Sequence, residues 1–431
     1  MLNVVFGDKA TNCAGMTRRS ALQVGGLGFG GLTLPNLMSA RAASRSEVRR
    51  DTSVVWLWLN GGPTHIETFD PKMTAPKEYR SVSGEVQTRL PGVTLGGHFQ
   101  GMAQQADRMT FVRSFQIPSS SHNTGAFWVN TGYAPRNRPS LGSITSRVRG
   151  PNHPQTGMPT YVQMGNIGFN SDAPVIPGSA WLGKAYSPFT PGGPARENMK
   201  LTTQLPRLED RRSLLQGLDK IRRNVDAKGM MDGMDGMNQQ AFSLILGKAT
   251  RAFDMQREDP KVVERYGGGL GQSMLTARRL CEVGCGFVAV SLQGWDMHGN
   301  VTGGMNGRGP EVDRAVSAFL SDLHQRGLDE NILLVISGEF GRTPRINKNA
   351  GRDHWGNLST LALAGGGLNM GQVIGTSSPK AEVPASGKVG PQQLMATVFH
   401  VLGIEPETSF DDPAGRPIPM LGSGQPIQGL I

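Results

Sequence analysis

The strongest constraint on the fold is a set of apolar runs that each end in a glycine-rich or polar turn. These runs occupy residues 51–60, 109–115, 286–292 and 331–337, and helix-like amphipathic segments at 273–283 and 311–327 precede the last two. Strands that alternate with helices form parallel sheets covered on both faces, and such strands are apolar throughout. The chain is therefore predicted to be an α/β protein with a mostly parallel central sheet.

The strand-like runs are spread from Val54 to Val401 with no clear linker between them. This distribution favours one sheet built from distant segments, so residues 44–431 are predicted to form a single domain. The 59 glycines and 28 prolines indicate long loops rather than a helical bundle. Residues 151–200 are expected to be surface loops, and residues 201–277 a mostly helical insertion.

The first 43 residues are predicted to be a twin-arginine export signal. Arg18 and Arg19 precede an apolar stretch that reaches Leu37, and Ala40-Arg41-Ala42 resembles a cleavage site. A membrane anchor is the alternative, but the glycines and the proline between Gly25 and Pro35 disfavour a spanning helix. The mature chain is thus expected in the periplasm or outside the cell, with no stable membrane span.

The formal net charge limits the classes of partner that the chain is expected to bind. The formal net charge is +10, and removal of residues 1–43 lowers it to +7 because four basic residues and one acidic residue are lost. This charge suits anionic substrates or acidic polymers. No compact stripe of Lys and Arg with interleaved aromatic residues is present, so nucleic acid is not an expected partner.

The segment Ser337–Trp355 carries the densest group of chemically active side chains. It follows the apolar run 331–337 and contains three candidate ligands and three arginines: Glu339, Asp353 and His354 beside Arg342, Arg345 and Arg352. In open α/β sheets, ligand sites form at the carboxyl ends of strands. This segment is predicted to bind an anionic substrate, with or without a metal. Glu339 paired with Arg342 or Arg345 as a structural ion pair is the alternative.

Three other turns follow predicted strands. One contains His65, a second contains Ser120, Ser121 and His122 before a helix-like segment, and a third contains Asp296 and His298. A helix N-terminus carries partial positive charge, so the serine-rich turn suits an anion. His98, His153, His324 and His400 lack clustered partners and are expected to be surface or core residues.

Two further patterns leave alternatives open. Cys281 and Cys285 share one face of a predicted helix, which allows either a disulfide bond or two buried thiols. The methionines between Met230 and Met237 are soft ligands, but the glycines among them favour a flexible loop over a metal-storage site.

Several segments together resemble the exported bacterial family called domain of unknown function 1501, which is itself similar to the alkaline phosphatase and sulfatase superfamily. The resemblance covers nearly the whole mature chain. It rests on Leu59–Lys72, Ser119–Gly132, Pro139–Ser143, Arg278–Asn300, Ser337–Asn347, Gly351–Asn357 and Pro391–Ile404. It implies an alkaline-phosphatase-like three-layer α/β/α sandwich.

The resemblance also implies one or two divalent metals, with zinc, calcium and manganese as candidates. Asp296, His298 and His354 form the best ligand set, and Glu339 with Asp70 or His65 forms a poorer second set. Ser120 or Ser121 is the expected nucleophile, although counting back from Thr131-Gly132 places His122 at the nucleophile position. Arg342 is the expected clamp for substrate oxygens.

The sequence differs from the superfamily pattern at three positions. Asn60 stands where a metal-binding Asp is usual, His122 stands in place of a hydroxyl or thiol, and Phe340 in place of a histidine. The leading hypothesis is an exported metal-dependent hydrolase of phosphate or sulfate esters, acting on a small-molecule or polysaccharide ester. The alternative is a noncatalytic protein that binds an anionic polysaccharide or serves as a partner in an exported degradation complex.

Overall fold

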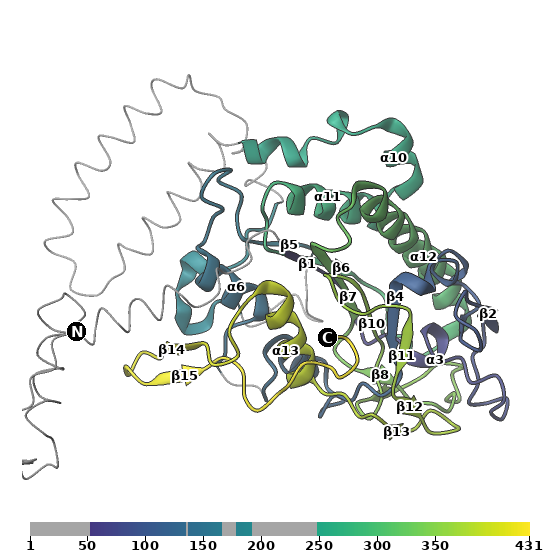
Figure 1. Cartoon of the computed structure of the whole chain (residues 1–431). Helices are drawn as coiled ribbons and strands as arrows, with labels where there is room; N and C mark the ends of the chain where they lie inside the picture. The colour runs from purple at the N-terminus through teal and green to yellow at the C-terminus, as the bar shows by residue number, and fades with distance from the viewer. Residues whose placement is uncertain (1–51, 135–136, 166–177, 192–247) are drawn as a thin grey trace, which may run out of the picture. The chain divides into compact units, whose positions relative to one another are not determined.

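The computed structural model describes residues 52–134, 137–165, 178–191 and 248–431. Their centre is a seven-stranded sheet in the order β11-β4-β10-β7-β1-β6-β5 (Figure 1). Its strands are β1 (Ser53–Leu59), β4 (Met109–Val112), β5 (Tyr161–Met164), β6 (Phe287–Leu292), β7 (Ile332–Ser337), β10 (Leu361–Gly365) and β11 (Gln372–Ile374). All run parallel except β10, which is antiparallel to both of its neighbours.

Strand β1 shows why the sheet is covered on both faces. All seven of its residues are buried. Val55, Leu57 and Leu59 belong to one hydrophobic core, and the alternating residues Trp56 and Trp58 belong to a second one. Successive side chains of a strand point to opposite faces, so a strand that is apolar throughout needs a cover on each side.

Helices supply these two covers (Figure 1). On one face pack α11 (Leu270–Glu282) and α12 (Val301–Arg326), which contribute Met274 and Phe319 to the first core. On the other face pack α5 (His122–Thr131), α6 (Leu141–Arg149) and α13 (Pro391–Leu402). The other α-helices among the described residues are α3 (His65–Thr68), α4 (Gln100–Ala103) and α10 (Pro260–Tyr266).

Short elements complete the described chain. The two-stranded sheets pair β2 (Glu85–Gln87) with β3 (Thr94–Gly96), β8 (Gly341–Arg342) with β9 (His354–Trp355), β12 (Thr376–Ser377) with β13 (Pro384–Ser386), and β14 (Ser409–Asp411) with β15 (Pro417–Pro419). The 3-10 turns are η1 (Ala106–Arg108), η2 (Ala180–Leu182), η3 (Lys184–Tyr186), η4 (Lys248–Phe253) and η5 (Met255–Arg257).

The predicted α/β class and mostly parallel sheet are confirmed, and the two cores make the sandwich three-layered. Three strands of the central sheet, β5, β10 and β11, lie outside the predicted runs. Tyr161–Met164 lies within the segment expected to be loops, yet it forms the edge strand β5. The strand β10 runs against the others.

Helix α12 also begins earlier than its predicted start at residue 311. Asn300 precedes it with a φ of 43°, and its side chain accepts a hydrogen bond from the Gly303 amide at 3.1 Å. Glycines and Pro310 in the first turns conceal the helical period in the sequence. The export signal, the methionine group at 230–237 and residues 201–247 of the expected insertion lie outside the described residues.

The two described cysteines are free and buried. Burial raises the pKa of the Cys281 thiol to about 12, and that of Cys285 well above its ordinary value. Thiolates are the reactive form of cysteine, so both side chains act as small apolar residues between α11 and the sheet.

A buried ionic network joins α11 to α12. The Arg278 guanidinium contacts Glu258 and Glu282 at 2.6 Å and Asp322 at 2.9 Å, and only 1% of its side chain is exposed. Tyr266 donates to Asp322 at 2.9 Å, and Arg326 contacts the same carboxylate at 2.7 Å. Burial alone raises the pKa of Glu258, but the neighbouring arginines outweigh it and lower this pKa to about 2.

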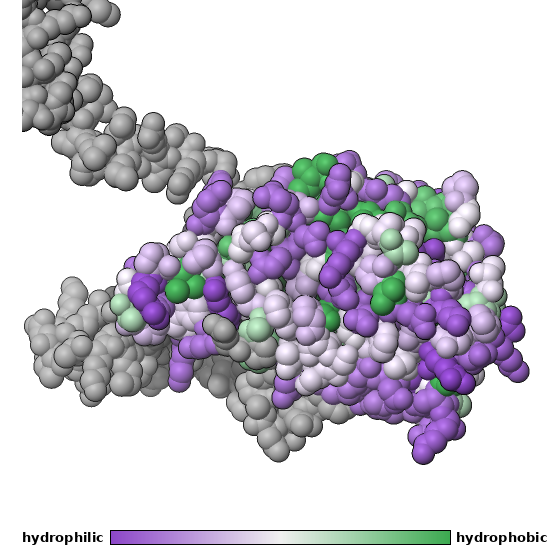
Figure 2. All heavy atoms as spheres, turned by 90° about the horizontal axis from the view of Figure 1, so that it is seen from below, coloured by the Kyte–Doolittle hydropathy of each residue, from purple (hydrophilic) through white to green (hydrophobic). Residues whose placement is uncertain are grey.

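The described surface is mainly polar. Figure 2 shows one face on which hydrophilic and neutral residues predominate and apolar residues are scattered. Among the described residues, Val383 and Ile431 are the exposed large hydrophobic side chains. No described helix has the length and apolar character needed to cross a bilayer.

Candidate metal centre

The candidate site forms where segments after three sheet strands meet. Asp296 and His298 follow β6, Glu339 follows β7, and His122 is the first residue of α5, which follows β4. His354 opens β9, which pairs with β8 so that Arg342 lies opposite it. The carboxyl ends of parallel strands lie on one edge of a sheet, and this edge is where ligand sites are expected.

Asp296 is the centre of the cluster. Its Oδ1 lies 3.1 Å from His298 Nε2 and 3.3 Å from His354 Nε2, and its Oδ2 lies 3.7 Å from His122 Nε2. The two nitrogens His298 Nε2 and His354 Nε2 are themselves 2.9 Å apart. Ligating atoms of His122, Asp296 and His354 all fall within 4.8 Å of one another. The structure therefore brings together the predicted metal ligands Asp296, His298 and His354, and adds His122.

The outer nitrogen of each imidazole has an acceptor. His298 Nδ1 lies 2.8 Å from Asp353 Oδ1, and His354 Nδ1 lies 3.0 Å from the carbonyl oxygen of Ser120. His122 Nδ1 lies 2.7 Å from Glu339 Oε1. Carboxylates and carbonyls accept hydrogen bonds, so each Nδ1 must donate. In a neutral imidazole with a proton on Nδ1, the Nε2 atom carries a lone pair.

These protonation states turn three lone-pair atoms toward one point. With both histidines neutral, Asp296 Oδ1, His298 Nε2 and His354 Nε2 are all acceptors at 2.9 to 3.3 Å from one another. A proton or a cation relieves the repulsion among them, and the Arg342 guanidinium, whose Nη2 donates to Asp296 Oδ1, supplies part of that positive charge. In a tetrahedral zinc site, with ligands at about 2.0–2.1 Å, the ligand atoms are about 3.3 Å apart. The spacing, the donor types and the outer hydrogen bonds fit a divalent ion.

Arg342 supplies a second, permanent positive charge. It is fully buried, and its Nη2 donates to Asp296 Oδ1 and to the Gly61 carbonyl. Its Nε donates to the Gly62 carbonyl at 2.8 Å, while Nη1 faces the Arg352 carbonyl at 3.1 Å and His298 Nε2 at 3.4 Å. All its N–H groups thus face protein acceptors. Arg342 as a clamp for substrate oxygens stays a prediction, and in this structure it neutralises Asp296.

The pKa shifts follow from these contacts. Burial alone raises the pKa of Asp296, but the contacts with His122, His354 and the Arg342 guanidinium outweigh it and hold this pKa well below its ordinary value. Burial alone lowers the pKa of His122, but hydrogen bonds to Asp296 and Glu339 outweigh it and raise this pKa. Asp296 is therefore a carboxylate, and His122 is poised to hold a proton.

Glu339 is almost completely buried behind His122. Its Oε1 accepts hydrogen bonds from His122 Nδ1 and from the Gly61 amide at 2.8 Å. Its Oε2 is buried and has no hydrogen-bond partner among the described residues. Among the described residues Glu339 forms an ion pair with neither Arg342 nor Arg345; its carboxylate contacts His122. Its role as a metal ligand stays a prediction.

The serine-rich turn lies beside the cluster. Ser120 is exposed, its carbonyl accepts from His354, and its Oγ accepts from the Gly356 amide at 2.8 Å. Ser121 is the exposed N-cap of α5, with no capping bond from its side chain. Neither hydroxyl contacts a described histidine or carboxylate in this structure, so their assignment as nucleophiles stays a prediction.

Two of the unusual positions in the sequence have structural roles. Asn60 Oδ1 accepts from Trp58 Nε1 at 3.1 Å, and its Nδ2 donates to Gln293. Phe340 is fully buried, and its ring centre lies 4.8 Å from that of His122 and 4.5 Å from that of His354. Phe340 thus holds the two imidazoles in place by packing.

His65 and Asp70 make their contacts outside this cluster. His65 is buried, and its Nε2 lies 3.0 Å from the Ala381 carbonyl. Asp70 accepts from Ser377 and lies 3.4 Å from Lys72 Nζ and 3.6 Å from Arg113 Nε. The predicted second ligand set of Glu339 with His65 or Asp70 is not assembled among the described residues.

The burial of His65 predicts a pH dependence of stability. Desolvation lowers the pKa of His65 from 6.5 to about 4. Between these values the unfolded chain binds a proton that the folded chain excludes. The contribution of His65 to the free energy of unfolding is fully present above pH 6.5. It is lost as the pH falls toward 4, by up to about 3 kcal/mol.

The slope of the unfolding free energy against pH is measurable by denaturant unfolding between pH 7.5 and 5. We expect His65→Gln, which keeps a donor for the Ala381 carbonyl, to flatten the pH dependence of the unfolding free energy. His400→Gln, at an exposed histidine of α13, serves as the control. An unchanged slope in His65→Gln would contradict the assignment.

The sequence did not indicate which outer groups fix the histidines. Asp353 was singled out as part of the dense segment, but its pairing with His298 depends on the turn between β8 and β9. The contact between the Gly61 amide and Glu339 could not be predicted from a side chain, because it is made by the backbone. The sequence indicated only a glycine directly after a predicted strand, and the φ of 114° at Gly61 explains why glycine is needed there.

Fold and cluster together define an α/β protein with a histidine and carboxylate centre at the carboxyl ends of its sheet strands. The chain belongs to the family described as protein of unknown function (DUF1501), whose model matches residues 51–431. This match confirms the family resemblance in the sequence.

No curated protein matches the chain. Solved structures similar to it include the PsFucS1 sulfatase from Pseudoalteromonas sp., with 12% identity, coverage of 86% of this chain and 70% of that chain, and a TM-score of 0.40. The lipoteichoic acid synthase LtaP from Listeria monocytogenes has 10% identity, coverage of 88% and 76%, and a TM-score of 0.40. The C-terminal periplasmic domain of EcEptC from Escherichia coli, in complex with Zn, has 10% identity, coverage of 88% and 92%, and a TM-score of 0.36. Likenesses of this size carry no information about chemistry.

Proposed function

We propose that the chain is an exported, metal-dependent hydrolase of phosphate or sulfate esters. The observation that supports this proposal most directly is the convergence of Asp296 Oδ1, His298 Nε2 and His354 Nε2 at 2.9 to 3.3 Å. Each histidine is fixed from outside by an acceptor on its Nδ1 atom, as in histidines that bind metals. Export is inferred from Arg18 and Arg19 and the apolar stretch after them.

Asp296, His298 and His354 would hold one divalent ion. Such an ion, when bound, supplies Lewis-acid polarisation of an ester oxygen and lowers the pKa of water. The buried Arg342 guanidinium already neutralises part of Asp296, which favours one ion over two at this carboxylate.

His122 is the residue best placed to move a proton. Glu339 holds its Nδ1–H, so its Nε2 faces the cluster and can hold or release a proton there. This arrangement of a carboxylate behind a histidine fixes the tautomer, as general acid–base catalysis requires. The N-terminus of α5, with Ser121 at its cap, would attract the anionic ester toward His122.

A specific set of observations favours noncatalytic binding of an anionic polysaccharide as the second candidate function. Arg342 is directed at the cluster, Phe340 packs where a ligand is usual in the resembled superfamily, and Asn60 is bonded to Trp58 and Gln293. The exposed hydroxyls of Ser120 and Ser121 contact none of the described histidines.

Hydrolysis distinguishes the two functions. We expect the full chain, supplied with zinc, manganese or calcium, to hydrolyse 4-nitrophenyl phosphate or 4-nitrophenyl sulfate, and to lose this activity after chelation. His122→Gln is expected to lower kcat by about 100-fold because a general acid–base group is removed. His324→Gln, at an exposed histidine paired with Asp329, should retain full activity.

If neither ester is turned over with any of the three metals, hydrolysis of these ester classes is rejected. Calorimetric titration with dextran sulfate then tests the binding role on the same preparations.

A further inference from the structure

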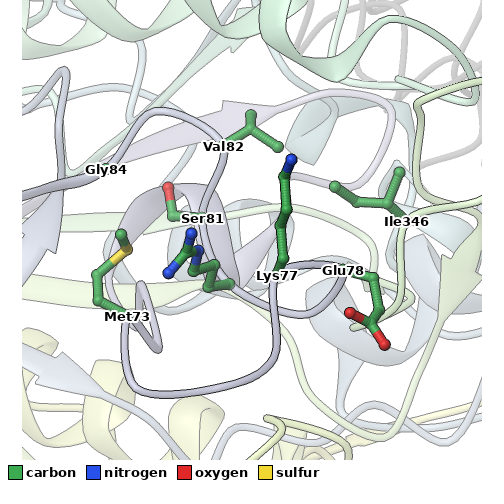
Figure 3. A pocket seen from close by; sticks show the side chains of 8 residues that line it. Met73, Lys77, Glu78, Ser81, Val82, Gly84 and Ile346 are labelled. Atoms are coloured by element: carbon green, nitrogen blue, oxygen red, sulfur yellow. The ribbon is translucent and has the colours of Figure 1, made fainter.

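A hollow separate from the metal centre lies beside the turn between β8 and β9, which also carries Asp353. It has a volume of about 570 Å³ (Figure 3). Its lining consists of Ile346, from the turn between β8 and β9, and of Met73, Lys77, Glu78, Arg80, Ser81, Val82 and Gly84. Ligand sites in proteins commonly enclose about 300–1,000 Å³. The hollow is therefore large enough for a small organic molecule.

The lining combines apolar walls with positive charge. Met73, Val82 and Ile346 supply apolar surface, and Lys77 extends between Val82 and Ile346 (Figure 3). Arg80 adds a second cation. Among the described residues neither Lys77 nor Arg80 forms an ion pair. Glu78 is exposed, and in Figure 3 its carboxylate points away from the Lys77 amine. The lining as a whole thus favours an anion that is attached to an apolar body.

The walls of this hollow are rigidly held. Glu67 and Arg352 form a fully buried ion pair at 2.9 Å. Glu67 Oε2 also accepts from Ser81 Oγ at 2.7 Å and from the Val82 amide at 3.0 Å. Arg352 Nη2 donates to the Arg80 carbonyl at 3.0 Å. A preformed wall lowers the entropy cost of binding a ligand.

The same turn contacts the candidate metal centre on its other side. Ile346 lines the hollow, and its neighbour Asn347 donates to the His298 carbonyl at 3.0 Å and to Asp353 Oδ1 at 3.1 Å. The hollow and the metal centre are thus separate spaces that share one wall.

We infer that this hollow, the Lys77 groove, is a binding site for an organic anion whose charged group is attached to an apolar ring or chain. The charged group lies between the Lys77 amine and the Arg80 guanidinium, and the apolar body packs on Met73, Val82 and Ile346. This inference goes beyond the proposed hydrolysis and holds whether or not the chain turns over esters.

The test is calorimetric titration of the full chain with naphthalene-2-sulfonate at low salt. This probe carries a charged group on an apolar body and has no ester bond to hydrolyse. We expect the double variant Lys77→Met/Arg80→Met to raise Kd at least tenfold, because both cations are lost while the apolar stems remain. Lys388→Met, which removes one charge at an exposed position elsewhere, should leave Kd unchanged.

Three further measurements assign the site. Ile346→Ala is expected to raise Kd about threefold, and inorganic sulfate should bind at least tenfold more weakly than the sulfonate, because the apolar wall contributes. Asp296→Asn should bind the sulfonate as the unaltered chain does. A Kd that changes in Asp296→Asn but not in Lys77→Met/Arg80→Met would place the ligand at the metal centre and overturn the inference. The inference is equally rejected if the unaltered chain does not bind the sulfonate, or if sulfate binds as tightly.

Discussion

Replacing Asp296 and His298 together by alanine is expected to abolish stoichiometric metal binding by the full chain. The two residues supply two of the three atoms that lie 2.9 to 3.3 Å from one another. Loss of a partner that only orients a ligand lowers metal affinity by about 10- to 100-fold, so loss of two ligands should lower it further, by more than about 100-fold. Elemental analysis of desalted protein measures the metal content directly.

The removal of Asp296 has a side effect that must be separated from metal loss. Arg342 is buried and loses its carboxylate partner, so the double variant should also be less stable. His298→Ala alone avoids this difficulty because His298 is 46% exposed. His324→Ala provides a matched control, since His324 forms a similar histidine–carboxylate contact with Asp329 at 2.9 Å. Metal retained at full stoichiometry in both site variants would refute the proposed ligand set.

Arg278→Met is expected to destabilise the fold by about 3 kcal/mol. Removing one partner of a buried ion pair costs about 3–5 kcal/mol because the remaining charge is left uncompensated. The lower end applies here, since Asp322 keeps Arg326 and Tyr266 as partners after Arg278 is lost. Denaturant unfolding at pH 7 measures the change in the free energy of unfolding.

Arg257→Met serves as the comparison for this variant. Arg257 contacts Asp254 at 3.1 Å, but the two side chains are 57% and 43% exposed. Exposed pairs contribute about 0.2–1 kcal/mol, so this variant should differ little from the unaltered chain. If Arg278→Met also cost less than about 1 kcal/mol, the buried network would not be a major source of stability.

The sequence predicted the sheet because its central strands are apolar on both faces. Residues 53–59 and 332–337 form β1 and β7 within the predicted runs, because neither run has an amphipathic pattern that would favour a helix. Strand β5 was missed because it has four residues in a segment rich in proline and glycine. Its position depends on pairing with β6, and that contact is not encoded in the local pattern.

The site was predictable in composition but not in its connections. Asp296, His298 and His354 were recognisable because ionisable residues at strand ends are unusual. The role of His122 could not be assigned from the sequence, since it depends on Glu339, which lies 217 residues away in the chain. The contacts of His65 could not be foreseen either: its neighbours in sequence resemble a site, and its contact with the Ala381 carbonyl depends on a residue more than 300 positions away.

The direction of β10 has a consequence for how this architecture can diversify. Leu361 of β10 pairs with Ser337 of β7, so the chain leaves and re-enters the sheet at adjacent positions on one edge. Residues 338–360, which include Glu339, Arg342, Asp353 and His354, therefore form an excursion closed at its base. Its length can change without shifting the register of any sheet strand, whereas the buried Arg342 and Arg352 must keep their partners in the Gly61–Gly62 turn and at Glu67. Variation among relatives is therefore expected at the exposed positions of this segment, where the centre's chemistry can change while the sheet is kept.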